Sequence, residues 1–125
     1  MTNARKARGM VTQRIVADDL RLSLWPFVES TGAGRQGADL TGTPGVCVEI
    51  KARRALDLQG WLAQAQRNAQ EGGGLAVLIV RPDGYGPAKL SQWPVVLRYE
   101  DWKRLMADAG YGSGQTSGMD SEHVP

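Results

Sequence analysis

The sequence predicts an α/β protein with one domain, in which helices flank a central mixed β-sheet. Its 125 residues are 42% hydrophobic, which suits a single core. Apolar residues recur at helical spacing in three segments, and short apolar runs bounded by glycine and proline, typical of strands, lie between them. We therefore expect the element order α-β-β-β-α-β-β-α around one sheet.

A flexible basic arm is expected over residues 1–8, followed by a helix over residues 9–24. Trp25 and Pro26 should end this helix, because the residue before a proline avoids the helical conformation. The apolar residues of the helix form two stripes: Val11, Ile15 and Leu22 on one face, and Ala17, Leu20 and Leu24, with Gln13 at the N-terminal end, on the other. We expect one side of this helix to pack on the sheet and the other on a partner subunit.

Three strands are expected next, over residues 27–30, 38–41 and 46–51. A glycine-rich loop separates the first two, and a Gly-Thr-Pro-Gly turn separates the second from the third. Side chains of the third strand alternate, with Cys47, Glu49 and Lys51 on one face and Val46, Val48 and Ile50 on the other. Charged side chains at the end of a buried strand cost free energy unless they are paired or bind a ligand.

The rest of the chain is expected to form a helix over 58–70, strands over 75–80 and 95–98, a helix over 99–109 and a disordered tail over 110–125. Asp57 can cap the first of these helices. The run Leu-Ala-Val-Leu-Ile-Val at 75–80 is apolar throughout, which predicts a strand buried on both faces. In the last helix, Trp102, Leu105 and Met106 should face inward.

Charge and cysteine content exclude several kinds of site. The net charge of +2 indicates no partner by itself. Basic residues nevertheless gather at two places: Arg5, Lys6, Arg8 and Arg14, and then Lys51, Arg53 and Arg54. Such clusters can follow a phosphate backbone, and the alternative is a solvated tail and loop. The single cysteine, Cys47, excludes a disulfide framework and a cysteine-rich zinc site. The single histidine, His123, lies in the expected tail, so any catalysis falls to carboxylates, lysine and a hard metal.

No segment is apolar and long enough to span a membrane, and no signal peptide follows the basic start. We therefore expect a cytoplasmic protein without a membrane partner.

Asp39 and Glu49 are separated by one tight turn, which predicts adjacent antiparallel strands with both carboxylates near one spot. Two nearby carboxylates repel each other unless a cation lies between them. Mg²⁺ suits this place, because it needs only one or two carboxylates besides water and phosphate oxygens, and the Ile50 carbonyl is a further candidate ligand. Lys51 can hold or help deprotonate a metal-bound water and neutralise charge in the transition state. These parts predict hydrolysis of a phosphodiester; the alternative is a surface ion-pair cluster.

Asp39 followed by Glu49-Ile50-Lys51 resembles the signature of the PD-(D/E)XK nuclease superfamily. The Pro-Asp pair of that signature is replaced here by Ala38-Asp39. The segments RKARGMVTQR, WPFVESTGAGRQGADLTGTPGVCVEIKAR, WLAQAQ and VLIVRPDGYG most resemble phage and archaeal Holliday-junction resolvases. The resemblance implies a restriction-endonuclease-like domain over 9–109 that uses Mg²⁺, for which Mn²⁺ can substitute. It also implies branched or double-stranded DNA as the substrate, a homodimer and, for a phage protein, action in the bacterial host cell.

The resemblance implies roles for further residues. Family members usually carry a Glu on the first helix that completes the metal site, and Gln13 at this position supplies no charge, although Glu29 offers one from the first strand. The basic clusters and the resemblance together predict DNA binding by the following residues: Arg5, Lys6, Arg8, Ser30, Thr31, Arg35, Arg53, Arg54 and Gln64. The alternative for Gln13 and Gln64 is a plain solvent-facing helix position.

Two other functions stay open. One is a restriction- or repair-like nuclease of the same fold, because branch specificity depends on dimer geometry. The other is a DNA-binding protein that kept the fold and lost strong metal binding, which Gln13 favours.

Overall fold

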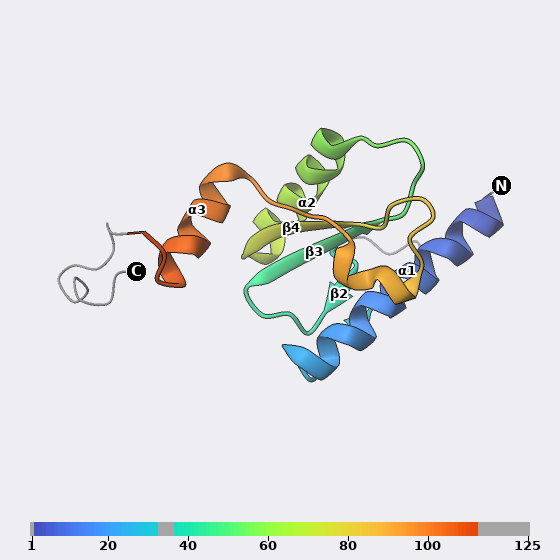
Figure 1. Ribbon diagram of the computed structural model, residues 1–125, viewed down its shortest axis with the longest axis horizontal. Helices are drawn as coiled ribbons and strands as arrows, with labels where there is room; N and C mark the ends of the chain where they lie inside the picture. The colour runs from blue at the N-terminus through green and yellow to red at the C-terminus, as the bar shows by residue number, and fades with distance from the viewer. Residues whose placement is uncertain (1, 33–36, 113–125) are drawn as a thin grey trace.

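The structure, a computed structural model, describes residues 2–32 and 37–112 (Figure 1). Its elements are α1 (Thr2–Ser23), β1 (Glu29–Ser30), β2 (Leu40–Thr41), β3 (Val46–Lys51), α2 (Leu58–Gly72), β4 (Leu75–Val80), the 3₁₀-helix η1 (Pro87–Gln92), β5 (Val95–Val96) and α3 (Tyr99–Asp108). The mixed α/β class and the predicted order of helices and strands are confirmed, with η1 added inside the loop before β5. The part of the expected tail at 113–125 lies outside the described residues.

The strands form two sheets, so the prediction of one continuous sheet is wrong. β4 lies at the centre of a three-stranded mixed sheet, parallel to β3 and antiparallel to β5. β1 and β2 form a separate antiparallel pair, in which Ser30 lies opposite Leu40. β2 lies beside β3, and the Asp39 N–H donates to the Val48 carbonyl at 3.0 Å. The two-residue length of β2 leaves too few backbone groups to continue this contact into a ladder.

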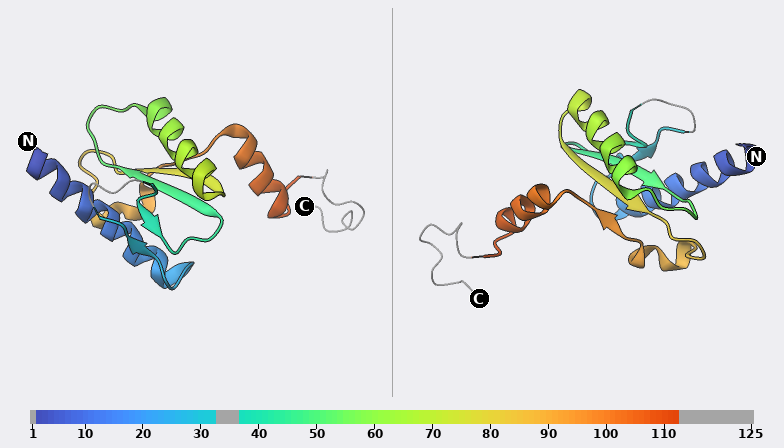
Figure 2. Two further views of the ribbon diagram at one scale, coloured as in Figure 1. Left: turned by 180° about the vertical axis from the view of Figure 1, so that it is seen from behind. Right: turned by 90° about the horizontal axis from the view of Figure 1, so that it is seen from above.

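α1 and α2 cover opposite faces of the three-stranded sheet (Figures 1 and 2). On the α1 side, Val48 and Ile50 pack with Val16 and Ala17 of the helix. On the α2 side, small residues form the core: Cys47, Ala65, Ala69 and Ala76. This division confirms the predicted alternation of β3, and it places the face with Glu49 and Lys51 under α2.

Helix α1 begins at Thr2, so the residues that were expected to form a flexible arm are helical. Its buried face includes Thr12, Gln13, Val16 and Ala17. In the opposite stripe Val11 and Leu22 are 47% and 90% exposed, whereas Ile15 packs against the core. Leu24, at the end of the other stripe, is 63% exposed, so the predicted division of α1 into a sheet-facing and a partner-facing stripe holds only in part.

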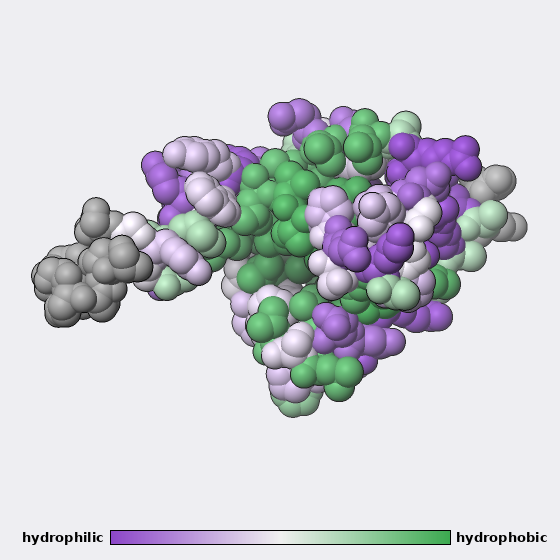
Figure 3. All heavy atoms as spheres, in the orientation of Figure 1, coloured by the Kyte–Doolittle hydropathy of each residue, from purple (hydrophilic) through white to green (hydrophobic). Residues whose placement is uncertain are grey.

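Helix α3 projects away from the body of the molecule (Figures 1 and 2). Trp102 and Leu105 are exposed, so the prediction that they face inward is wrong. Hydrophobic residues cover the surface between α3 and the rest of the molecule (Figure 3). The hollow there is lined by Leu58, Leu62 and Val96 among others. Within 2–32 and 37–112, no helix has the length and apolar character needed to cross a membrane.

Candidate active site

Strand β3 carries Glu49 and Lys51 on its α2 face at the carboxyl end of the strand. The side chain of Glu49 is only 3% exposed, and that of Lys51 is 16% exposed. Their charged groups form an ion pair, with 3.4 Å between Lys51 Nζ and Glu49 Oε2. A surface ion-pair cluster does not describe this arrangement, because both groups are largely removed from water.

Asp39 is held against the edge of β3. Its Oδ2 accepts a hydrogen bond from the Ile50 N–H at 2.7 Å, and its own N–H donates to Val48. The N–H and C=O of one strand residue point to the same side, so the Ile50 carbonyl also faces Asp39 rather than β4. The structure therefore brings together Asp39, Glu49, Lys51 and the Ile50 backbone, as the spacing predicted.

The turn between β2 and β3 depends on glycine. Gly42 has a φ of 80°, a conformation that other residues adopt only with strain. A Cβ at this position would also overlap the Phe27 carbonyl. Glycine at this position therefore lets the chain after β2 pass close to the residue pair before β1.

Burial destabilises the ionised form of both carboxylates, and the charge of Asp39 adds to this effect at Glu49. Burial, and next the negative charge of Asp39, raise the pKa of Glu49 to about 7, although Lys51 and Asn68 oppose this shift. Burial also raises the pKa of Asp39, against the hydrogen bond from Ile50 and the charge of Lys51. A cation at this place would offset both effects.

The donor set fits Mg²⁺ as an open site. Among residues 2–32 and 37–112, no three or more His, Cys, Asp or Glu side chains form a group able to hold a metal ion. Asp39 and Glu49 supply two hard oxygen donors, and Mg²⁺ usually keeps several waters and takes further ligands from a substrate phosphate. These two side-chain donors alone would hold the ion weakly.

Gln13 reaches the β1–β2 pair from α1. It is 9% exposed, and its Oε1 accepts a hydrogen bond from Ser30 Oγ at 2.9 Å. The alternative of a solvent-facing Gln13 is therefore wrong. Within the described ranges no hydrogen bond joins Gln13 to Asp39, so its link to the carboxylates passes through Ser30 and the neighbouring backbone.

Thr31 supports Asp39 from the other side. Its N–H donates to the Asp39 carbonyl at 2.9 Å, and its hydroxyl lies 3.2 Å from the carbonyls of both Ala38 and Asp39. Thr31 and Ser30 therefore hold the segment that carries Asp39. Glu29 is exposed in β1.

Asn68 of α2 is a site residue that the sequence reasoning missed. Its Nδ2 donates to the Gly37 carbonyl at 3.3 Å and lies 3.5 Å from Glu49 Oε1. A signal was available, because Asn68 falls three residues after Ala65, at a position where the apolar stripe of α2 continues. The predicted Gln64 is half-buried on the same helix, and no polar side-chain contact is seen for it in the described part of the chain.

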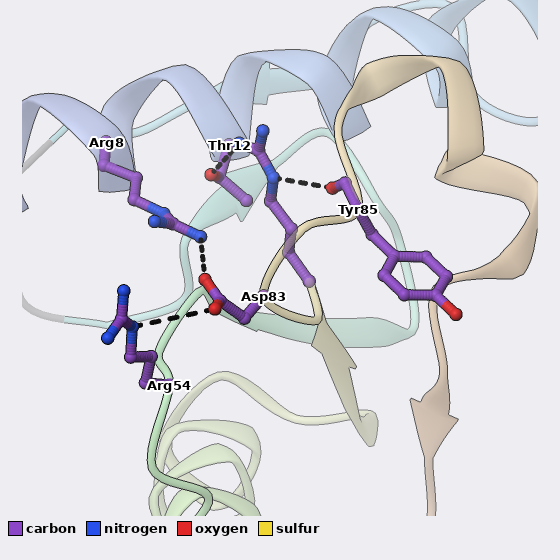
Figure 4. A network of polar contacts seen from close by, with 6 residues as sticks. Arg8, Thr12, Arg54, Asp83 and Tyr85 are labelled. Atoms are coloured by element: carbon purple, nitrogen blue, oxygen red, sulfur yellow. Dashed lines mark hydrogen bonds and ion pairs between the residues drawn. The ribbon is translucent and has the colours of Figure 1, made fainter.

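The predicted DNA-binding arginines occupy different places. Arg5 and Lys6 are exposed on α1, and Arg53 is half-buried after β3. Arg8 and Arg54 meet at Asp83, which the sequence reasoning also missed (Figure 4). The predicted Arg35 lies outside the described residues.

No model of a known protein family matches this chain, and no curated protein is significantly similar to it.

Proposed function

We propose that this protein is a Mg²⁺-dependent endonuclease that hydrolyses phosphodiester bonds in DNA, and that it resolves Holliday junctions. The observation that carries the proposal is the meeting of Asp39 and Glu49 from two segments at one edge of β3, with Lys51 beside them. If these residues formed only a buried ion-pair cluster and bound no cation, the ionised Glu49 would lower the stability of the folded protein at neutral pH.

In this proposal Asp39, Glu49 and the Ile50 carbonyl hold the metal ion. Bound Mg²⁺ supplies Lewis-acid stabilisation of the phosphate oxygens and a more acidic water. The Lys51 amino group, placed by its contact with Glu49, neutralises negative charge that develops on the phosphate in the transition state. Asn68 keeps Glu49 oriented, while Ser30 and Thr31 hold the backbone around Asp39.

We further propose that the protein acts as a homodimer. A four-way junction presents two symmetric scissile phosphates, and a two-fold dimer presents two sites to them. The apolar side chains exposed at the end of α1 and just after it support this, because Leu22 is 90% exposed, Leu24 is 63% exposed and Phe27 is 82% exposed.

The experiment that tests the proposal is cleavage of an end-labelled four-way DNA junction, compared with linear duplex, in Mg²⁺ and in EDTA. We expect cleavage of the junction only with Mg²⁺, and loss of cleavage in Glu49→Gln. Equal cleavage of linear duplex would favour a restriction- or repair-like nuclease instead.

A second candidate is a DNA-binding protein without catalysis. It is favoured by Gln13, a neutral residue where the resembled family carries a carboxylate, and by the absence of a third acidic ligand among the described residues. Tight DNA binding without cleavage at any Mg²⁺ or Mn²⁺ concentration would select it.

A further inference from the structure

A group of arginines lies where the parallel pair β3–β4 ends. Arg81 follows β4 directly, and its N–H donates to the Lys51 carbonyl at 2.8 Å. Arg8 comes from α1 and Arg54 from the segment after β3, so side chains far apart in the sequence meet here (Figure 4). The carboxyl end of parallel strands is a common place for ligands in open α/β sheets.

Arg81 is held rigidly in this group. Its Nη1 donates to Thr12 Oγ1 at 2.9 Å, its Nε donates to the Tyr85 carbonyl at 3.0 Å, and its guanidinium lies 5.4 Å from the Trp93 ring centre. Burial, and then the charge of Arg8, lower its pKa. Within the described ranges no carboxylate forms an ion pair with Arg81, so its charge adds to that of its neighbours.

Asp83 lies between the two outer arginines. Its Oδ1 is 3.9 Å from Arg8 Nη2, and its Oδ2 is 3.6 Å from Arg54 Nε. Charge-assisted hydrogen bonds between such groups are shorter, about 2.7–2.9 Å. The side chain of Asp83 is 54% exposed and that of Arg54 is 85% exposed, so these ion pairs are weak and open readily.

One carboxylate therefore faces an excess of positive charge. A surface hollow of about 560 Å³ lies beside these side chains and is lined by Arg8, Arg81, Asp83 and Tyr85 among others. A phosphodiester presents two oxygens to guanidinium groups much as a carboxylate does. The group that binds Asp83 weakly is thus suited to bind a backbone phosphate in its place.

We propose that Arg8 and Arg54, here called the arginine clamp, bind one phosphodiester group of the DNA backbone beside the fixed side chain of Arg81, and that the Asp83 carboxylate occupies the place of this phosphate in the free protein. The inference rests on the proposed DNA substrate. It adds a second contact for the same DNA, on the α1 side of the sheet, and an acid that competes with the phosphate for the arginines. Asp83 lies in a Pro-Asp-Gly turn, from which its exposed side chain can swing aside.

The test is DNA affinity, measured by fluorescence anisotropy on a labelled four-way junction in EDTA, where cleavage does not interfere. We expect Asp83→Asn to tighten binding about two- to fivefold at low salt, because the competing acid is removed. We expect Arg54→Ala to weaken binding and to lower the slope of log affinity against log salt by about 1.

The control is Asp108→Asn, which makes the same charge change at an exposed position on α3. The inference would be overturned if Asp83→Asn bound DNA no more tightly than Asp108→Asn, because Asp83 would then have no role in DNA binding. It would also be overturned if Asp83→Asn bound DNA more weakly than wild type, because Asp83 would then hold the arginines in place. Thermal unfolding of each variant shows that the fold is kept. If the wild-type protein cleaves the junction but Asp83→Asn binds DNA no more tightly, only the arginine clamp is contradicted. If Asp83→Asn binds more tightly but the wild-type protein does not cleave, only the proposed nuclease activity is contradicted.

Discussion

Glu49 combines almost complete burial with a negatively charged neighbour, and this gives the protein a measurable dependence on pH. Its pKa is about 7 in the folded chain, above the ordinary value of a Glu. A carboxyl whose pKa is raised by folding holds its proton in the native state at pH values where the unfolded chain has released it. The ionised Glu49 therefore opposes folding when no cation is bound.

We predict that metal-free protein loses stability as the pH rises from about 4.5 to about 7, and that Glu49→Gln removes most of this loss. The loss attributable to Glu49 is about 3 kcal/mol at most. Urea unfolding in EDTA at several pH values measures it. A wild-type profile parallel to that of Glu49→Gln across this range would show that Glu49 ionises normally.

Gln13 is a neutral side chain that contacts the segment before Asp39, so a carboxylate in its place would add negative charge near the proposed metal site. Its amide accepts a hydrogen bond from Ser30, and a carboxylate at this position can accept the same bond. We predict that Gln13→Glu lowers the Mg²⁺ concentration for half-maximal cleavage, by about tenfold if the added charge contributes about 1.4 kcal/mol. A Mg²⁺ titration of the cleavage rate measures this. An unchanged midpoint with unchanged DNA affinity would remove Gln13 from the site, and weaker DNA binding would place it against a substrate phosphate.

At the scale of elements, local sequence patterns predicted the features that depend on a single stretch of the chain. The spacing of Asp39, Glu49 and Lys51 and the alternation of β3 are local, and the structure confirms where these side chains lie. The division into two sheets depends on which backbone groups pair, which no single segment encodes. Asn68 and Asp83 were missed for the same reason, because their partners come from distant parts of the chain.

The turn between β2 and β3 gives a prediction at this scale. Gly42→Ala should destabilise the protein more than Gly45→Ala. Both residues have positive φ, 80° and 81°, which costs a non-glycine residue about 1–2 kcal/mol. A Cβ at Gly42 also overlaps the Phe27 carbonyl, whereas a Cβ at Gly45 meets no atom within 4 Å. Urea unfolding of both variants measures the difference, and equal losses would mean that the β1–β2 pair does not pack as closely as described.

At the scale of the whole molecule, apolar surface remains on the single chain. Leu22 and Phe27 are exposed near the end of α1, and Tyr99 and Trp102 are exposed on α3. A sequence pattern can show that a helix is apolar on two sides, but not whether the second side is covered by the same chain or by another.

We predict that Leu22→Glu raises the dissociation constant of the proposed dimer at least about tenfold, because it places a charge in an apolar contact. Sedimentation analysis over a range of protein concentrations measures this. Leu56→Glu, at another exposed leucine, serves as the control and should leave the dimer intact. Wild-type protein that stays monomeric at high concentration would contradict the dimer.

The most direct test of the proposed chemistry is the cleavage rate of Lys51→Ala on a four-way junction in Mg²⁺, measured together with its DNA affinity. Lys51 contacts Glu49, and in the proposed mechanism it neutralises the charge that develops on the phosphate. We predict a folded variant that binds DNA nearly as well as wild type but cleaves it at least about a hundredfold more slowly, whereas Lys103→Ala on α3 cleaves at the wild-type rate. Cleavage by folded Lys51→Ala at the wild-type rate would contradict the account.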